Sequence, residues 1–139
     1  MDGYAFEDLQ VGQSASLGTT ITDADILMFA ALSLDTNPVH MDAEAAAGSV
    51  FKERVAHGML SAGLIGAVMG TRLPGNGTAD LEQTLRFRRL VRIGDTVTAT
   101  VEVIALDPAK LQATLRTVCR ARGKVAMDGE AVVLPRSRG

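Results

Sequence analysis

The stretch VAHGMLSAGLIGAVMGT, residues 55–71, decides the fold that this sequence predicts. From Gly58 onward it contains no charged side chain, and its large apolar residues fall on nearly every side of a helix. A helix that is apolar almost all round belongs in the interior of a protein. Small residues recur every fourth position, at 58, 62, 66 and 70, and form one stripe. Glycine costs a helix on the order of 1 kcal/mol relative to alanine, so the stripe indicates close approach by a sheet, a partner chain or a ligand.

Downstream of this helix the apolar residues recur every second position, which is typical of strands with one buried face. Residues 96–105 and 111–120 alternate in this way, and 79–91 and 125–134 are expected to form two further strands. Turn-forming residues at 107–110 and 122–124 separate them. The buried face of 96–105 is expected to comprise Val97, Ala99, Val101, Val103 and Ala105. The sequence therefore predicts one α+β domain, residues 1–139, in which an antiparallel meander in the C-terminal half wraps a long buried helix.

The sequence of the N-terminal third predicts one short strand and two helices. Residues 14–21 form the strand, and Thr22 with Asp25 forms a capping box in front of a helix over 23–33. Asp42 is expected to cap a short alanine-rich helix, 43–47, that ends at Gly48. The charges of the following connector, 52–54, are expected to face solvent.

Composition excludes several classes of protein. The formal charge of −2 lacks the basic footprint of a nucleic-acid-binding protein. A lone cysteine, Cys119, leaves no internal disulfide and suggests a reducing compartment. The N-terminus has no signal pattern, and the longest uncharged run, 58–70, has 13 residues, fewer than the roughly 20 that span a bilayer. We therefore expect a cytoplasmic protein with no membrane or nucleic-acid partner.

The two histidines of the chain, His40 and His57, lie close to the start of the long helix. Asp35 precedes His40 by five residues, with Asn37-Pro38 between them. Proline removes a backbone donor and pushes the preceding residue out of the helical region, so we expect a rigid loop that presents a carboxylate and an imidazole to one space. Taken alone, Asp35 would be more typical of a turn in which it bonds backbone amides, and it is the combination with Asn37, Pro38 and His40 that favours a functional role. A metal site built from Asp35, His40, Asp42 and His57 has suitable ligand types, but no Cys or Glu-x-x-His pattern accompanies it, and none is predicted.

The residues from Asp35 to His40, with Asp42, and the later Val55-Ala56-His57-Gly58-Met59-Leu60 resemble the hydratase motif of the MaoC-like, (R)-specific enoyl-CoA hydratases. The resemblance extends along most of the chain, to Gly129–Val133. It implies a hot-dog fold, a curved antiparallel sheet around a central helix, and an acyl-CoA thioester as substrate, with no other cofactor. It also implies a homodimer or higher homo-oligomer, with the thioester near the subunit interface.

Carried over by position, the resemblance makes Asp35 and His40 the catalytic pair and makes the Gly58 amide the oxyanion donor. Asp35 is expected to be the base and His40 its partner donor, with a reversed or shared assignment as the alternative. Six further positions are assigned to substrate binding: Asn37, His57, Met59, Gly66, Met69 and Val132. Four of these have structural alternatives, namely loop bracing for Asn37, hydrogen bonding or helix capping for His57, and core packing for Met69 and Val132.

Two positions depart from the family pattern. Gly66 stands where some members have a serine near the active site, so that side-chain hydrogen bond is absent. Leu90 stands where a proline often precedes the valine, within a segment rich in arginine. These arginines, at 86, 88, 89 and 92, are expected either to meet coenzyme A phosphates or to form a solvated strand edge.

Two other functions fit a hot-dog protein. A thioesterase often carries a carboxylate on its central helix, whereas 58–71 contains no acidic residue. The third candidate function is that of a subunit with little activity of its own in a hetero-oligomeric dehydratase. The presence of both Asp35 and His40 counts against this function.

Overall fold

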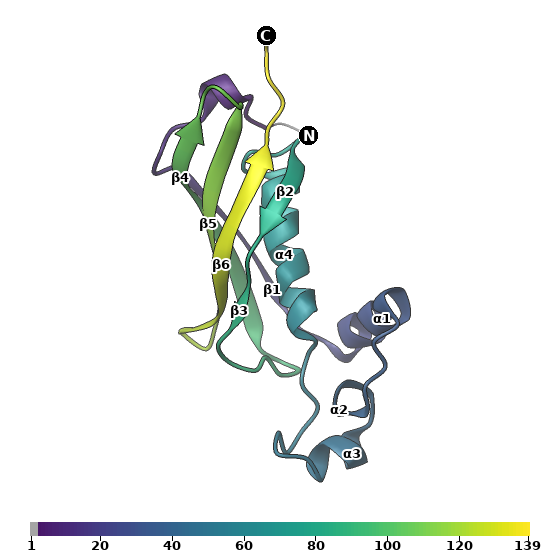
Figure 1. Ribbon diagram of the computed structural model, residues 1–139. Coiled ribbons are helices and arrows are strands. Elements are labelled where there is room, and N and C mark those ends of the chain that lie inside the picture. Colours follow the sequence, from purple (N-terminus) through teal and green to yellow (C-terminus); the bar gives the residue numbers. More distant parts are fainter. Residues whose placement is uncertain (1–2) are drawn as a thin grey trace.

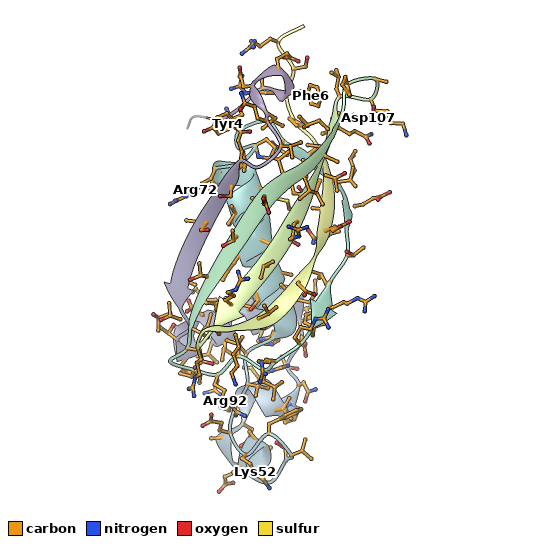
Figure 2. All side chains as sticks on the ribbon, turned by 90° about the vertical axis from the view of Figure 1, so that its left-hand side faces the viewer. Tyr4, Phe6, Lys52, Arg72, Arg92 and Asp107 are labelled. Atoms are coloured by element: carbon orange, nitrogen blue, oxygen red, sulfur yellow. The ribbon has the colours of Figure 1, made fainter. Side chains whose placement is uncertain are left out.

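A computed structural model describes residues 3–139 of the chain. Its elements are the 3-10 turn η1 (Phe6–Asp8), the helices α1 (Asp23–Ser33), α2 (Pro38–Met41), α3 (Ala43–Ala47) and α4 (Gly58–Thr71), and the strands β1 (Ser14–Thr20), β2 (Ala79–Gln83), β3 (Arg86–Phe87), β4 (Thr96–Asp107), β5 (Gln112–Ala121) and β6 (Lys124–Leu134). All strand pairs are antiparallel, in the order β1-β4-β5-β6-β2, with β3 also paired to β6. The sheet lies against α4, which is the hot-dog arrangement predicted from the sequence (Figures 1 and 2).

The core lies between the sheet and α4. Alternate residues of β4 and β5 are fully buried, because successive side chains of a strand point to opposite faces, and they pack on Ile65 and Val68 of the helix. The expected buried face of β4 holds as far as Val103. A shift of register between Val103 and Ala105 then turns Ala105 outward, where it is exposed. Sequence periodicity contained no sign of this irregularity.

The meander prediction is correct only for β4, β5 and β6. The stretch 79–91 forms two short strands rather than one, and both pair with β6, so β2 becomes an edge of the sheet while β1 covers β4 at the other. The expected single strand is interrupted at Thr84, which lies against Gly129 of β6. A Cβ atom on Gly129 would lie 1.8 Å from the Thr84 carbonyl oxygen, so the interrupted strand requires glycine opposite it.

Helix α4 begins and ends as predicted, but only one side of it is buried within the chain. Ser61, Ile65, Val68 and Met69 are buried, whereas a Cβ atom at Gly66 or at Gly70 would have no neighbour within 4 Å. Half of the small-residue stripe, Gly66 and Gly70, is therefore open in a single chain. No helix among residues 3–139 is long and apolar enough to cross a lipid bilayer.

Helices α1, α2 and α3 form a lobe beyond the N-terminal end of α4 (Figure 1). The capping box of α1 is present: the Asp25 amide donates to the Thr22 hydroxyl, and the Thr22 amide donates to the Asp25 carboxylate. The Asp42 carboxylate accepts from two amides at the start of α3, as expected of a helix cap. Arg54 does not face solvent as predicted, because its guanidinium binds the Asp23 carboxylate at 2.6 Å and the His40 carbonyl oxygen.

Candidate active site

Asp35 and His40 are placed by the segment that joins α1 to α2. Helix α1 ends at Ser33, and the capping residue Leu34 has a φ of 67°, in the left-handed region. The Asp35 carboxylate accepts from the Asn37 amide at 3.3 Å, and the Asn37 side chain accepts from the Val39 amide at 3.3 Å. Asn37 therefore braces the segment, as its structural alternative predicted. The expected rigid loop is wrong beyond Asn37: Pro38 begins the one-turn helix α2, a position that suits proline because its missing N–H would be unpaired there.

His40 has a defined hydrogen-bonding arrangement on α2. Its Nδ1 lies 2.7 Å from the Val55 carbonyl oxygen, and because a carbonyl only accepts, Nδ1 carries the proton. The Nε2 atom lies 3.9 Å from Oδ2 of Asp35, too far for a direct hydrogen bond. The carboxylate and the imidazole thus face the same space, and the separation leaves room for one oxygen atom bonded to both. Asp35 is half exposed, whereas the His40 side chain is largely buried.

His57 supports both members of this pair from behind. Its Nε2 donates to the Asp35 backbone carbonyl at 2.8 Å, and its ring stacks on His40 with centroids 4.0 Å apart. Phe29 of α1 contacts the same ring, at 4.8 Å between centroids. His57 is 2% exposed. Its side chain does not cap α4, so of the two structural roles expected for it, hydrogen bonding is correct and capping is wrong.

The geometry of this cluster fits proton transfer better than metal chelation. Ligand atoms of Asp35, His40 and His57 lie within 4.8 Å of one another. However, the two rings are inclined by only 27°, so their in-plane lone pairs run side by side rather than toward one point. One nitrogen of each ring is also held by a backbone carbonyl oxygen.

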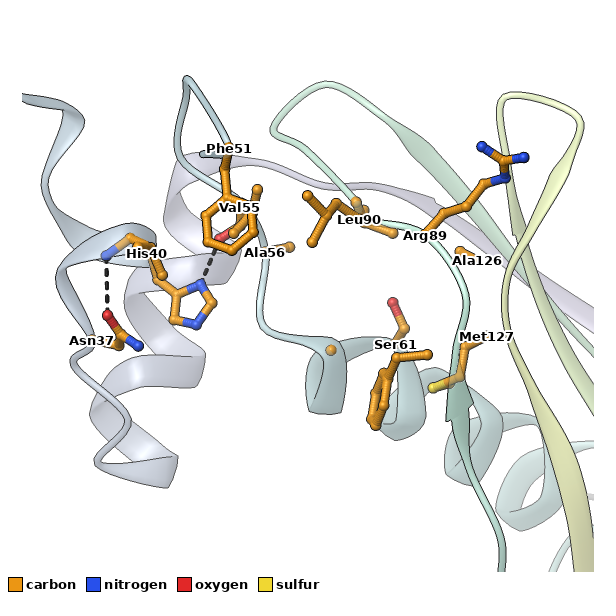
Figure 3. A pocket seen from close by; sticks show the side chains of 14 residues that line it. Asn37, His40, Phe51, Val55, Ala56, Ser61, Arg89, Leu90, Ala126 and Met127 are labelled. Carbon is orange, nitrogen blue, oxygen red and sulfur yellow. Dashed lines mark hydrogen bonds between the residues drawn. The ribbon is translucent and has the colours of Figure 1, made fainter. Parts of the chain in front are cut away.

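A cavity of about 360 Å³ opens beside His40 and extends to the start of α4 and the link after β3 (Figure 3). Its volume falls in the range of small-molecule sites. The lining is mostly hydrocarbon, with few polar groups. The lining residues are Asn37, Val39, His40, Phe51, Val55, Ala56, Gly58, Ser61, Phe87, Arg89, Leu90, Val91, Ala126 and Met127.

Gly58 lies in the cavity wall at the first position of α4. The first amides of a helix have no partner within it and lie at its positive end. A Cβ atom at this position would lie 2.6 Å from the Phe87 ring. The close approach that requires glycine here is therefore an aromatic side chain of the same protein.

The cavity includes only part of the predicted substrate-binding set. Asn37 lines it, whereas Met59 lies on the exposed side of α4 and Gly66 faces open space. Met69 is 2% exposed in the core. Val132 lies between the buried Ala131 and Val133 and therefore points to the opposite face of β6. Met69 and Val132 were expected to line an acyl pocket, and within one chain they do not. Met69 instead packs in the core, as its structural alternative predicted.

Several lining residues were missed by the sequence analysis. Ser61 follows Gly58 by three positions and so shares its face of the helix, which is a signal that the sequence contained. Phe51, Phe87 and Met127 come from three distant segments, and no sequence pattern joined them. Behind Ser61 lies Cys119, whose burial raises the pKa of its thiol to about 11.

A second ionisable group, Asp95, supports the link that forms the cavity rim. Its carboxylate accepts from the Arg92 amide at 3.0 Å and from the Arg122 guanidinium at 2.6 Å. Burial by itself raises the pKa of Asp95, but the hydrogen bonds from Arg92 and Arg122 outweigh it and hold the pKa below its usual value.

The model of the MaoC like domain matches residues 8–122. An (R)-specific enoyl-CoA hydratase from Rhodospirillum rubrum is 57% identical over 98% of this chain and 94% of its own length. A 3-hydroxybutyryl-CoA dehydratase from Methylorubrum extorquens is 47% identical over 92% of this chain and 82% of its own length.

The structure is also similar to solved structures. The R-hydratase PhaJ1 from Pseudomonas aeruginosa, in its unliganded form, superposes with a TM-score of 0.93 at 44% identity, over 98% of this chain and 88% of that one. The similarity covers the whole domain, including the lobe that carries Asp35 and His40.

Proposed function

The chain belongs to the MaoC-like domain family, and from that premise we propose that it is an (R)-specific enoyl-CoA hydratase in which Asp35 and His40 add water to the substrate. The reaction is the reversible hydration of a trans-2-enoyl thioester to the (R)-3-hydroxyacyl thioester, which makes the enzyme a hydro-lyase. In the reverse direction the reaction is the dehydration of a 3-hydroxyacyl-CoA, and the relative from Methylorubrum extorquens is named for such a dehydration.

The observation that carries the catalytic assignment is the 3.9 Å separation between His40 Nε2 and Asp35 Oδ2, at one end of an apolar cavity. The hydrogen bond to Val55 holds the Nδ1 proton, so Nε2 is the atom that exchanges protons with the substrate. A water between the two groups donates to the carboxylate while its oxygen faces C3 of the enoyl group. The cavity wall holds the acyl thioester against this water.

We assign Asp35 as the base and protonated His40 as the acid. Asp35 takes a proton from water as the oxygen bonds to C3, and the Nε2 proton of His40 goes to C2. The carbon–carbon double bond is consumed, and Asp35 then returns its proton to Nε2, which restores the pair. Because the two groups lie side by side, both additions occur on one face of the substrate.

Charge develops on the thioester oxygen during this addition, and the Gly58 amide at the start of α4 is the proposed donor to it. Such a donor is worth about 2.7–4 kcal/mol to the barrier. The reaction needs only proton transfers and one hydrogen-bond donor, so we propose that no cofactor takes part and that the coenzyme A thioester is the substrate.

We further propose that the working form is a homodimer. Helices α1 and α4 present an apolar groove to solvent, lined by Met28, Leu32, Leu60 and Leu64, and β2 is an edge strand whose five residues are all exposed. On helix α4, Gly66 and Gly70 are open, and a second copy would bury these surfaces together. Analytical ultracentrifugation tests the homodimer: a monomer at working concentration would contradict it.

The free, buried Cys119 is consistent with the reducing cytoplasm, which we propose as the compartment of this protein.

An absorbance assay with crotonyl-CoA tests the proposed function. Loss of the enoyl chromophore without release of free thiol is the expected result, and chiral analysis of the product should give the (R)-3-hydroxy form. Thiol release would instead indicate a thioesterase. No turnover by the homogeneous protein would indicate a subunit that needs a different partner.

A further inference from the structure

A second depression lies next to the active-site cavity and has the opposite character. We call it the basic groove, and its volume is about 410 Å³. Five basic side chains line it: Arg88, Arg89, Arg92, Arg122 and Lys124. They come from two segments at one end of the sheet: the link after β3, and the turn between β5 and β6 together with the first residue of β6. The chain as a whole carries a net charge of −2, so this groove reverses the sign of the surface locally.

We propose that the basic groove binds the phosphorylated nucleotide end of coenzyme A, and so selects coenzyme A thioesters over thioesters of an acyl-carrier protein. This inference rests on the proposed function, because it assigns the two ends of one substrate to two adjoining sites.

The groove and the active-site cavity are continuous. Arg89, Leu90 and Ala126 line both of them. Figure 3 shows the Leu90 side chain lying over the apolar cavity, whereas the Arg89 guanidinium extends away from it toward the turn between β5 and β6. A substrate with an apolar acyl thioester at one end and anions at the other can therefore extend from His40 past Leu90 into the groove.

The cations of the groove differ in how far they are neutralised. Arg88 binds the Asp128 carboxylate at 3.2 Å, Arg92 binds Glu53 at 3.0 Å and Arg122 binds Asp95 at 2.6 Å. Among residues 3–139, no carboxylate oxygen lies within 4.0 Å of the charged nitrogens of Arg89 or Lys124. These two side chains are the ones free to bind an incoming anion.

The chemistry of coenzyme A matches this arrangement. Its pantetheine arm is uncharged, and its far end carries a diphosphate and a 3′-phosphate, which guanidinium and ammonium groups bind through charge-assisted hydrogen bonds. A volume of about 410 Å³ is that of a small-molecule pocket, which suits a nucleotide better than the surface of a carrier protein.

The test uses the double variant Arg89→Glu/Lys124→Glu with two substrates that share the crotonyl group. Crotonyl-CoA has the nucleotide, and the crotonyl thioester of N-acetylcysteamine lacks it. We expect the ratio of the KM for crotonyl-CoA to the KM for the short thioester to rise roughly tenfold in the variant, from two lost and reversed surface contacts. In the wild-type enzyme, salt should raise the KM for crotonyl-CoA and leave that for the short thioester nearly constant, because exposed charges are screened.

The matched control is Lys110→Glu, which reverses one charge in the turn between β4 and β5. Figure 2 shows Asp107 of that turn at the opposite end of the sheet from Arg92. This control should leave both KM values within about twofold of wild type, as is usual for surface substitutions away from a site. An unchanged ratio in the double variant, or an equal rise for both thioesters, would overturn the proposal. So would a larger loss with crotonyl-acyl-carrier protein than with crotonyl-CoA.

Calorimetric titration with adenosine 3′,5′-bisphosphate separates this proposal from the proposed function, because it needs no turnover. The wild-type protein should bind this probe, and the double variant should bind it roughly tenfold more weakly. If the wild type hydrates crotonyl-CoA but does not bind the probe, the groove proposal fails and the hydratase stands. If it binds the probe and hydrates neither thioester, the hydratase fails.

Discussion

The imidazole of His40 stacks on the imidazole of His57, with ring centroids 4.0 Å apart and planes inclined by 27°. Only His40 reaches the cavity. His57 is buried, and it holds the Asp35 carbonyl oxygen through Nε2. The two histidines of the chain therefore have separate positions: His40, the proposed proton donor, faces the cavity, and His57 holds the His40 ring and the Asp35 backbone from behind.

Removing the carboxylate should abolish most of the activity. Asp35→Asn should lower kcat by at least about a hundredfold, the usual scale for a general base, while circular dichroism shows an unchanged fold because the side chain is half exposed. Turnover near the wild-type value would refute the role assigned to Asp35.

His40→Ala should have an effect of similar size on kcat, at least about a hundredfold, because it removes the Nε2 proton that C2 receives. His40→Gln is the matched variant: it restores an amide but no titratable group. It should therefore remain as inactive as the alanine variant, and recovery of activity in it would show that the ring does not transfer a proton.

His57→Ala should act on both stability and turnover. Loss of a buried ring and of its hydrogen bond should lower the free energy of unfolding by about 2–4 kcal/mol. The pH profile of kcat/KM should also change, because His40 loses the ring that it stacks on. His57→Gln keeps a side-chain N–H for the Asp35 carbonyl, so it should lose less stability and less turnover than His57→Ala. A variant that is less stable but has the wild-type pH profile would limit His57 to packing.

Gly58 and Phe87 should be energetically coupled. A methyl group at position 58 meets the Phe87 ring, so Gly58→Ala should displace that ring and narrow the cavity, with a fall in kcat/KM and in stability. In the double variant Gly58→Ala/Phe87→Ala the clash is absent. A double-mutant cycle on urea unfolding should give a coupling energy of at least about 0.5 kcal/mol, and additive losses would contradict the contact.

Asp95 should contribute stability that depends on pH. Its pKa in the folded protein is held below the usual value, so the folded state binds this proton less readily than the unfolded state. The contribution is complete above about pH 3.9, the ordinary pKa of aspartate, and is lost as the pH falls through the lower folded value. Urea unfolding from pH 7 to pH 3 should show the gap between wild type and Asp95→Asn closing at the acid end. A gap that stays constant would contradict it.

The sequence by itself determined most of the elements and the motif that contains Asp35 and His40. The capping box at Thr22 and the Asp42 cap are local signals, in which a few neighbouring residues satisfy each other's backbone groups. The alternation along β4 and β5 is equally local. The proximity of Asp35 to His40 could be predicted because both belong to one distinctive motif of six residues, 35–40.

Only the tertiary structure decided where those elements meet. It placed β2 at an edge beyond β6, turned Ala105 outward and directed Val132 away from the core, since register and strand order depend on contacts between residues far apart in the chain. It also brought Phe87 against Gly58 and stacked His57 on His40. Such contacts join segments whose separate patterns contain no information about one another, so no periodicity or spacing could have predicted them.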